Sequence, residues 1–309
     1  MQLPADPPAP AGRARLSPWL ILLVPPLCWA GNFVIGRAVH ADIPPAALTF
    51  WRWAVAALAL LPLAGADAWS RRRLILRHWR FLSVLAVSGV VGFQFFVYQG
   101  LQTTTAINGV LIIATIPVAI PIIAFALDGA KVTRRQAVGI ALSLLGVAVV
   151  VLRGDPRLLL GLHLAEGDLW MFLAVPAWGL YSVVLRRRPA ELPPLTLLLA
   201  TILPGLLLLT LGWGAELALR GGFTASWPLL ASILYVGLIA SVLAFACWNH
   251  GVEQVGAAKA GLYIHLMPVF AAMLAMAFLG ETLRGYHFAG VAAIAAGIWL
   301  SSTAGRNRT

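Results

Sequence analysis

The sequence predicts an all-α polytopic membrane protein with ten transmembrane helices, built as two inverted five-helix repeats with both termini in the cytoplasm. Three features lead to this prediction: the composition, the spacing of the apolar segments and an internal repeat. Of the 309 residues, 61% are hydrophobic and only 11% are charged, and the mean hydropathy is +0.88. A helix needs ~20 mostly apolar residues to cross ~30 Å of hydrocarbon, and apolar segments of that kind fill almost the whole chain. So few charges could not cover the surface of a soluble domain of this size.

The two halves of the chain are degenerate copies of each other. The segment WNHGVEQVGAAKAGLYIHLMPVFAAMLAMAFLGE at 248–281 resembles YQGLQTTTAINGVLIIATIPVAIPIIAFALDGA at 98–130. A shift of 151 positions aligns Gly100 with Gly251, Ala106 with Ala257, Asn108 with Lys259, Pro117 with Pro268, Gly129 with Gly280, Gly139 with Gly290 and Gly146 with Gly297. A shift of 149 lays residues 28–37 over 177–186. A repeat this long indicates two structurally equivalent halves.

The spans follow one another with short polar breaks. Residues 1–17 are rich in Pro and Ala and predict a disordered cytoplasmic tail. The apolar segment from about 19 to 35 is too long for a signal-peptide core and lacks a convincing cleavage site, so we expect an uncleaved first span. The other spans are predicted at roughly 46–65, 81–99, 106–127, 136–152, 168–185, 194–215, 228–249, 257–279 and 286–303. The repeats then comprise residues 18–153 and 168–303, and 304–309 form a second cytoplasmic tail.

The basic residues predict the orientation. With the N-terminus in the cytoplasm, the inside segments hold fifteen Lys and Arg and the outside segments five, while Arg52 and Lys259 lie within spans. Five spans per half make the second repeat cross the membrane in the opposite sense, as in many secondary transporters, where the substrate binds near the midplane. The net charge of +11 lies mostly in the breaks and does not indicate nucleic-acid binding. Cys28 and Cys247 lie in apolar segments and indicate no disulfide framework.

Aromatic and polar residues form matching helical faces on the first span of each half. Trp29, Asn32, Phe33 and Gly36 share one face, and Trp178, Tyr181, Ser182 and Leu185 share the equivalent face. These faces are either aromatic walls of a central cavity or packing surfaces against neighbouring helices. Pro26 and Pro176 precede the two tryptophans and predict kinks.

Two further pairs of spans carry matching polar stripes. Gln94 and Tyr98 on span 3 correspond to Phe245 and Asn249 on span 8, where Trp248 and His250 adjoin. Asn108, Ile112 and Thr115 on span 4 correspond to Lys259, Tyr263 and Leu266 on span 9. Polar groups in lipid are costly unless they face protein or water, so we expect these stripes to face inward. His265 points away from its stripe, which favours packing over ligand contact.

Two cations lie within spans. Lys259 either reaches back to the headgroups or attracts an anionic group, such as an amino-acid carboxylate, at the mouth of the cavity. Arg52, whose counterpart in the repeat is Thr201, is expected to pair with helix-end carbonyls or across the interface between halves, with a gating role as the alternative.

Carboxylates are absent from the predicted span interiors. All eleven fall in tails, loops or span edges, including Asp168, Glu253 and Glu281. This favours facilitated export over proton antiport, although coupling through His250, His265 or an edge carboxylate stays open. On span 10, Gly285, Ala289, Ala293 and Gly297 form a ridge of small residues, for which packing within a monomer is favoured over a homodimer interface.

These features resemble the EamA-type drug/metabolite transporter superfamily. The resemblance covers about 19–303 and is carried by the paired Trp-Gly/Ala segments, FWRWA at 50–54 and the stretch from Pro268 to Gly280-Glu281; the first copy departs from it with Ala130 in place of the glutamate. It implies an inner-membrane permease with a cavity between spans 1, 3, 4, 6, 8 and 9. It further implies export of amino acids, possibly aromatic, as in the bacterial exporters that the chain is most similar to.

We therefore expect a transporter that exports amino acids or related metabolites, with no cofactor or metal, no nucleic-acid partner and no enzymatic activity. Trp29 and Trp178 would stack on the substrate. The other candidate substrate-binding residues are Asn32, Phe33, Gln94, Tyr98, Asn108, Tyr181, Trp248, Asn249, Lys259 and Tyr263. Arg52, Pro117, Pro268 and Glu281 are assigned gating or structural roles. The alternatives are a multidrug or cationic-metabolite exporter, a membrane-embedded enzyme, for which no HExxH, GxSxG or intramembrane carboxylate pair is found, and a structural or sensor protein.

Overall fold

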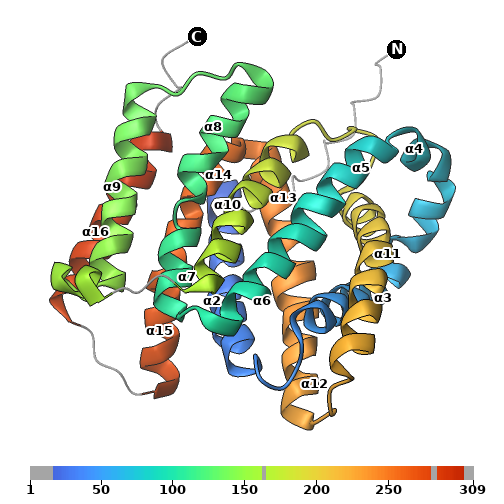
Figure 1. Ribbon diagram of the computed structural model, residues 1–309. Helices are drawn as coiled ribbons and strands as arrows, with labels where there is room; N and C mark the ends of the chain where they lie inside the picture. The colour runs from blue at the N-terminus through green and yellow to red at the C-terminus, as the bar shows by residue number, and fades with distance from the viewer. Residues whose placement is uncertain (1–16, 162–164, 280–283, 303–309) are drawn as a thin grey trace, which may run out of the picture.

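The computed structural model describes residues 17–161, 165–279 and 284–302, and within these ranges the regular structure is helical. The helices stand side by side as a bundle (Figure 1). The first half comprises α1 (Pro18–Ile21), α2 (Val24–Ala38), α3 (Pro45–Ser70), α4 (Arg72–Arg77), α5 (Trp79–Leu85), η1 (Ala86–Gly92), α6 (Phe93–Thr103), α7 (Ala106–Ile113), α8 (Ile116–Asp128) and α9 (Arg134–Val151). After η2 (Pro156–Gly161), the second half comprises α10 (Glu166–Leu185), α11 (Pro194–Arg220), α12 (Trp227–Leu234), η3 (Tyr235–Leu243), α13 (Ala244–Val255), α14 (Ala257–Gly261), η4 (Leu262–Leu266), α15 (Met267–Leu279) and α16 (Gly285–Ser302).

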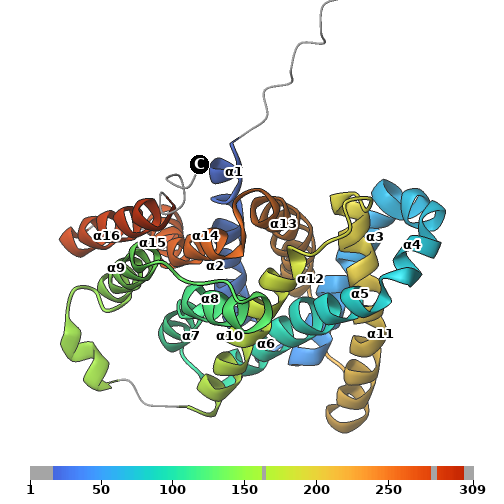
Figure 2. The ribbon, with the colours of Figure 1, turned by 90° about the horizontal axis from the view of Figure 1, so that it is seen from above.

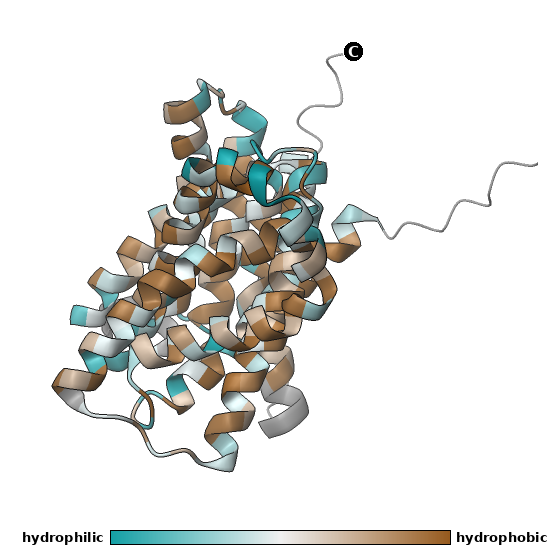
Figure 3. Cartoon of the chain, turned by 90° about the vertical axis from the view of Figure 1, so that its right-hand side faces the viewer, coloured by the Kyte–Doolittle hydropathy of each residue, from teal (hydrophilic) through white to brown (hydrophobic). Residues whose placement is uncertain are grey.

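Nine helical segments of the described residues are long and apolar enough to cross a membrane. They are Pro18–Ala38, Pro45–Ser70, Trp79–Thr103, Asn108–Asp128, Arg134–Val151, Glu166–Leu185, Pro194–Leu219, Trp227–Val255 and Ala257–Leu274. The tenth predicted span corresponds to α16, which has 18 residues and is not among the nine. Apolar residues dominate the middle of the bundle and polar residues gather toward its ends (Figure 3). The chain is therefore a multi-pass membrane protein.

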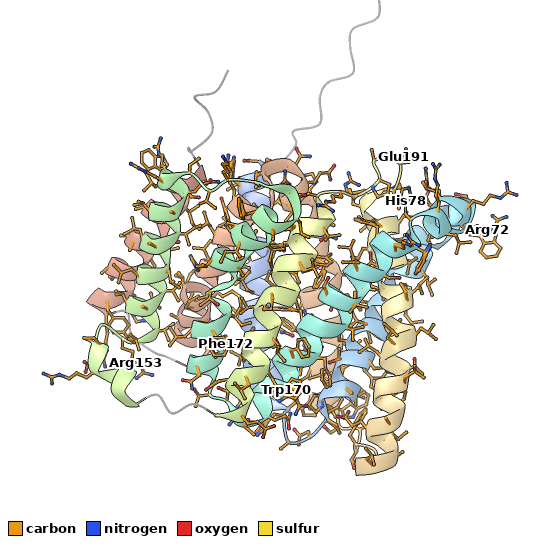
Figure 4. The ribbon with its side chains drawn as sticks, turned by 45° about the horizontal axis from the view of Figure 1, so that its top comes forward. Arg72, His78, Arg153, Trp170, Phe172 and Glu191 are labelled. Carbon is orange, nitrogen blue, oxygen red and sulfur yellow. The ribbon has the colours of Figure 1, made fainter. Side chains whose placement is uncertain are left out.

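Long apolar side chains on the outside of the bundle fit a lipid environment. Leu63, Leu207 and Leu211 are more than two-thirds exposed, at 68%, 69% and 68%. Several polar side chains lie toward the two ends: Arg72, His78 and Glu191 toward one, and Arg153 toward the other (Figure 4).

Spans 4 and 9 are broken at equivalent depths. Span 4 is interrupted at Ala114 and Thr115, between α7 and α8, and span 9 contains the five-residue 3₁₀ segment η4 between α14 and α15. Pro117 is the second residue of α8 and Pro268 the second of α15. A proline disfavours α-helical geometry in the residue before it but is tolerated in the first turn of a helix. The two matched prolines thus account for a break followed by a fresh helix start in both halves.

Spans 3 and 8 both contain a π-helical stretch. The shift of 151 places η1 on residues 237–243, which lie within η3. A π-helical turn leaves carbonyl groups without their usual i+4 partners and often occurs at functional sites. The two stretches show that the repeat extends to irregular backbone that single-residue propensities do not reveal.

The fifth spans of the two halves, α9 and α16, lie side by side at one edge of the bundle (Figure 2). Gly139 packs against Gly297, and Gly146 packs against Gly290, so closely that a Cβ atom on Gly139 would lie 2.6 Å from the Gly297 carbonyl oxygen. The buried face of α16 therefore contains Gly290, Ile294, Gly297 and Ser301. Of the ridge predicted on this helix, Gly297 makes this contact within the monomer, whereas Ala289 is exposed.

The kinks predicted at Pro26 and Pro176 differ from each other in the structure. The first span breaks at Leu22 and Leu23, just before α2, and Pro26 lies in the first turn of that helix. Pro176 lies inside α10, which runs without interruption from Glu166 to Leu185.

Candidate functional site

The centre of the bundle holds a buried guanidinium. Arg52 lies about two turns into α3, and its side chain is 0% exposed. Its partners are all neutral oxygens. Nε donates to Ser241 Oγ at 2.8 Å, and Nη2 donates to the Ala240 carbonyl at 3.1 Å. Nη1 lies 2.6 Å from Gln94 Oε1, 2.7 Å from Tyr98 OH and 3.3 Å from Asn32 Oδ1. These partners come from α2, α6 and η3, and therefore from both repeats. Arg52 thus contacts a backbone carbonyl and groups across the interface between the halves.

The π-helical stretch η3 supplies two of these contacts. The Ala240 carbonyl accepts a hydrogen bond from Arg52 and another, of 3.1 Å, from the indole Nε1 of Trp29. In the equivalent stretch η1, the Val90 carbonyl accepts a hydrogen bond of 2.8 Å from Trp53 Nε1. Both stretches therefore present backbone acceptors to buried side chains.

Two tyrosine–asparagine pairs occupy equivalent places in the two halves. Tyr98 donates a hydrogen bond of 2.7 Å to Asn32, and Tyr181 donates one of 2.8 Å to Asn249. The repeat aligns Asn32 with Tyr181 and Tyr98 with Asn249, so the donor and the acceptor have exchanged spans. Each pair joins the first and third spans of its own half. All four residues were predicted from the sequence as candidate site residues.

An aromatic cluster fills the space beside these pairs. The ring of Trp178 lies 5.0 Å from that of Trp29, 5.4 Å from that of Trp248 and 5.3 Å from that of Phe245, measured between centroids. Trp178 also stacks on Tyr181 at 5.1 Å with an interplanar angle of 26°. Within the described structure, the buried Nε1 atoms of Trp178 and Trp248 have no hydrogen-bond partner.

A small cavity of about 10 Å³ lies at this cluster. It is lined by Trp29, Asn32, Phe33, Phe93, Gln94, Ile113, Ile116, Trp178, Ile264 and Met267. A space of that size holds about one water molecule. The central site is therefore closed around its own side chains in this conformation, and admission of a solute requires the helices or side chains to move.

At one end of the bundle, which we call the Asp168 end, a buried carboxylate connects the start of α10 to Thr104 and Asn108. Asp168 in the first turn of α10 is 1% exposed and accepts hydrogen bonds from the Thr104 hydroxyl, from Asn108 Nδ2 at 3.2 Å and from the Ala165 backbone at 2.9 Å. The sequence correctly placed Asp168 at a span edge but gave no sign of its burial. Its two side-chain partners are about 60 residues distant in the chain.

The opposite end, the basic end, contains an open pocket of about 210 Å³. Three cations line it, Lys131, Arg186 and Lys259, together with Gln136 and Ser301 among others. The neighbouring arginines are engaged with acids: Arg187 pairs with Asp128 and Arg188 with Glu253. No such ion pair involves the three pocket cations within the described residues.

Asn108 and Lys259, which were predicted to face one cavity from opposite sides of the membrane, lie at opposite ends of the bundle. Asn108 contacts Asp168 at one end, and Lys259 lines the pocket at the other. The position equivalent to Asp168 in the repeat is Trp19, which stacks on Tyr263 with ring centroids 6.4 Å apart, so the contact between Asn108 and Asp168 has no counterpart at Lys259. Tyr263 makes this stacking contact and does not line the central cavity.

His265, Pro117 and Pro268 do not line the central cavity. His265 is fully buried, with Nε2 2.8 Å from the Ala114 carbonyl and Nδ1 2.7 Å from the Ser143 hydroxyl. Pro117 and Pro268 are buried at the helix starts described above. Glu281 lies outside the described residues.

Two contributors to the site were missed by sequence reasoning. Ser241 and Asp168 are buried polar residues that each bond a candidate residue. A serine within an apolar span is a weak signal because it often bonds its own helix, as Ser241 also does to the Val236 carbonyl at 2.8 Å.

Comparisons with known proteins agree with a transporter architecture. The EamA-like transporter family matches residues 16–152 and 165–303. The uncharacterized transporter YyaM of Bacillus subtilis (strain 168) is 24% identical over 291 residues, which cover 93% of this chain and 94% of that protein. A probable terminal-alkyne amino-acid exporter of Streptantibioticus cattleyicolor is 26% identical over 303 residues, covering 94% of this chain and 95% of that protein. A probable amino-acid metabolite efflux pump of Salmonella typhimurium is 28% identical over 179 residues, covering 55% and 58%. A protein crystal structure with 20% sequence identity has a TM-score of 0.70 and covers 93% of this chain and 98% of that chain, which shows a shared fold.

Proposed function

This chain belongs to the EamA-like transporter family, and we propose that it exports amino acids or related small metabolites by alternating access through the central site. The observation that supports this best is the meeting of both repeats at one buried aromatic and polar cluster. Trp29 and Trp178 come from equivalent spans, and their ring centroids lie 5.0 Å apart in this cluster. Two of the relatives are named as amino-acid exporters or efflux pumps, which favours the same substrate class.

The proposal includes ten spans with both termini in the cytoplasm of a bacterial cell, a location in the inner membrane and a monomeric protein. The basic end would then face the cytoplasm, as the positive-inside rule requires. Its open pocket would receive the substrate, and Lys259 would attract the carboxylate group. The Asp168 end, where the buried carboxylate accepts its hydrogen bonds, would face the outside.

A cationic-drug exporter is disfavoured by the charges at the centre. Arg52 is positive, and its described partners contain no carboxylate that could hold a cationic solute. Protection of cells from cationic dyes by the expressed protein would contradict this part of the proposal.

Counterflow into proteoliposomes, with a panel of labelled amino acids, tests the function. We expect uptake of at least one amino acid, reduced in both Trp178→Ala and Lys259→Ala relative to equal amounts of folded protein. Arg220→Ala is a matched control for Lys259→Ala, because residue 220 ends α11, far along the chain from every segment of the basic pocket. Unchanged flux in both test variants would remove this site.

A further inference from the structure

The charge of Arg52 is not neutralised by any acidic residue in the part of the chain that the structure describes. Each of its five hydrogen bonds within the described structure is to a neutral oxygen, and none of the three ion pairs found there includes it. An uncompensated charge within a membrane-spanning bundle is costly and commonly marks a functional site. A structural arginine would gain more from a buried carboxylate partner than from neutral oxygens.

More acceptor oxygens surround Arg52 Nη1 than this nitrogen has hydrogens to donate. Nη1 has two hydrogens, yet the oxygens of Gln94, Tyr98 and Asn32 lie within 2.6–3.3 Å of it. The contact to Asn32 is the longest, and the Asn32 oxygen already accepts from Tyr98 at 2.7 Å. A carboxylate could therefore replace one or two of these oxygens without leaving any donor unpaired.

The same region has hydrogen-bond donors without acceptors. Trp178 Nε1 and Trp248 Nε1 are buried and have no partner within the described structure. A buried donor without an acceptor is unfavourable unless a ligand or water satisfies it. The centre thus combines a positive charge that no described carboxylate neutralises with two buried indole N–H groups that have no acceptor there, which suits a site for an anion.

The polar partners of Arg52 lie where a solute would enter the central site. Asn32 and Gln94, both partners of Arg52, line the central cavity together with Trp29, Phe33 and Trp178. A solute entering there would meet the polar groups around Arg52 on one side and aromatic rings on the other.

We propose that Arg52 and the indole N–H of Trp178 together bind the carboxylate group of the transported molecule, and that the surrounding aromatic rings hold its apolar part. The inference rests on the proposed export function, because it takes the central cavity as the transport site. It specifies the substrate class as a monocarboxylate with an apolar side chain, which includes zwitterionic amino acids. Gln94 and Tyr98, which bond Arg52 in this conformation, would give way to the carboxylate. A solute with an ammonium group alone would be repelled by Arg52.

Three related compounds separate the contributions of the charged groups. Phenylalanine carries both a carboxylate and an ammonium group, 3-phenylpropionate only the carboxylate, and phenethylamine only the ammonium group. Thermal unfolding of the purified protein in detergent measures the binding of each without requiring transport, because a ligand that binds the folded state raises the midpoint. We expect phenylalanine and 3-phenylpropionate to raise the midpoint and phenethylamine to have no effect.

The variants test which residues are responsible. Arg52→Gln should weaken the apparent affinity for both carboxylates at least about tenfold, as loss of a charged hydrogen bond does, and Arg52→Lys should be intermediate because it keeps the charge but loses the fork. Trp178→Phe keeps an aromatic ring but removes the N–H, and should weaken carboxylate binding even if Arg52→Gln does not fold. Thr201→Val is the matched control: Thr201 is the counterpart of Arg52 in the repeat, is buried, and within the described residues its hydroxyl bonds the Leu197 carbonyl of its own helix at 2.8 Å. The apparent affinity of Thr201→Val for both carboxylates should equal that of the native protein.

The outcomes distinguish this inference from the export function. Stabilisation by phenethylamine equal to that by the carboxylates would overturn the inference, as would absence of stabilisation by either carboxylate. Unchanged affinity in both Trp178→Phe and any folded Arg52 variant would overturn it as well. Carboxylate binding that depends on Arg52, without counterflow of any amino acid, would instead refute export and support the binding site.

Discussion

His265 contacts the residue that occupies its own position in the other repeat. Its Nε2 lies 2.8 Å from the Ala114 carbonyl, and the shift of 151 aligns residue 114 with residue 265. Only residues near the axis that relates the two halves can touch their own counterparts, so the breaks in spans 4 and 9 meet at that axis. A carbonyl can only accept, so Nε2 carries the hydrogen, and in the neutral ring Nδ1 accepts from the Ser143 hydroxyl.

The position of His265 predicts a structural role. His265→Ala should lower the free energy of unfolding by about 2–4 kcal/mol, because it leaves a cavity and removes the hydrogen bond to the Ala114 carbonyl, while the Ser143 hydroxyl keeps its bond to the Ile140 carbonyl. The loss should appear as a lower thermal midpoint of the detergent-solubilised protein. His287→Ala is the control, since His287 is a partly exposed residue near the start of α16. A normal midpoint with abolished counterflow would instead indicate direct contact with the substrate.

The two tyrosine–asparagine pairs predict unequal effects of removing equivalent hydroxyl groups. Tyr98 donates to Asn32 and accepts from Arg52, whereas the Tyr181 hydroxyl makes one hydrogen bond within the described residues, to Asn249. Tyr98→Phe should therefore cost about 1–3 kcal/mol of folding free energy, and Tyr181→Phe about 1 kcal/mol. Thermal midpoints of the two single variants give the comparison. Equal losses would show that the Arg52 contact contributes little to stability.

Much of the architecture was predictable because it depends on patterns that repeat along the chain. Apolar length predicted most of the spans, and the two shifts paired Trp29 with Trp178 and Tyr98 with Asn249 before their contacts were known. These features are local in sequence or are repeated within it. The breaks before the matched Pro117 and Pro268 in spans 4 and 9 were not predicted, although the alignment of the two prolines was seen in the sequence.

The remaining features depend on contacts between residues distant in the chain. Burial of Asp168 requires the end of α6 to approach the start of α10, which the position of a carboxylate at a span edge does not reveal. The π-helical stretches carry no distinct composition, so the carbonyl of Ala240 could not be identified as an acceptor. Lys259 lacks the carboxylate contact that Asn108 makes, because one half has Asp168 where the other has Trp19.

A carboxylate placed next to Arg52 should inhibit the transporter while stabilising it. Gln94 Oε1 lies 2.6 Å from Arg52 Nη1, so the near-isosteric change Gln94→Glu would create a buried ion pair at this position. We expect a higher thermal midpoint together with loss of phenylalanine counterflow, because the new side chain would compete with the substrate carboxylate. Gln94→Leu is the control that removes the amide without adding charge. Full transport in Gln94→Glu would show that Arg52 need not be free to bind the solute.

The Asp168 end predicts a variant that changes the balance between access states. Asp168 accepts three hydrogen bonds, of which one oxygen receives both the Asn108 amide and the Ala165 backbone N–H. In Asp168→Asn, the new amide can place only one oxygen there, so either these two donors or the Thr104 hydroxyl loses its acceptor. The closed form of this end should lose about 1–3 kcal/mol, and the population should shift toward conformations in which it is open.

Cysteine labelling can measure that shift. With Cys28 and Cys247 replaced by Ala, a single cysteine at Ile113 reports on access to the central cavity, because Ile113 is buried and lines it. A membrane-impermeant thiol reagent applied from the outside should label this cysteine several-fold faster in Asp168→Asn than in its parent. Asp42→Asn is the control, since Asp42 is exposed and takes no part in the contacts at Asp168. Equal labelling rates in all three proteins would mean that the carboxylate anchors the start of α10 without closing the path to the cavity.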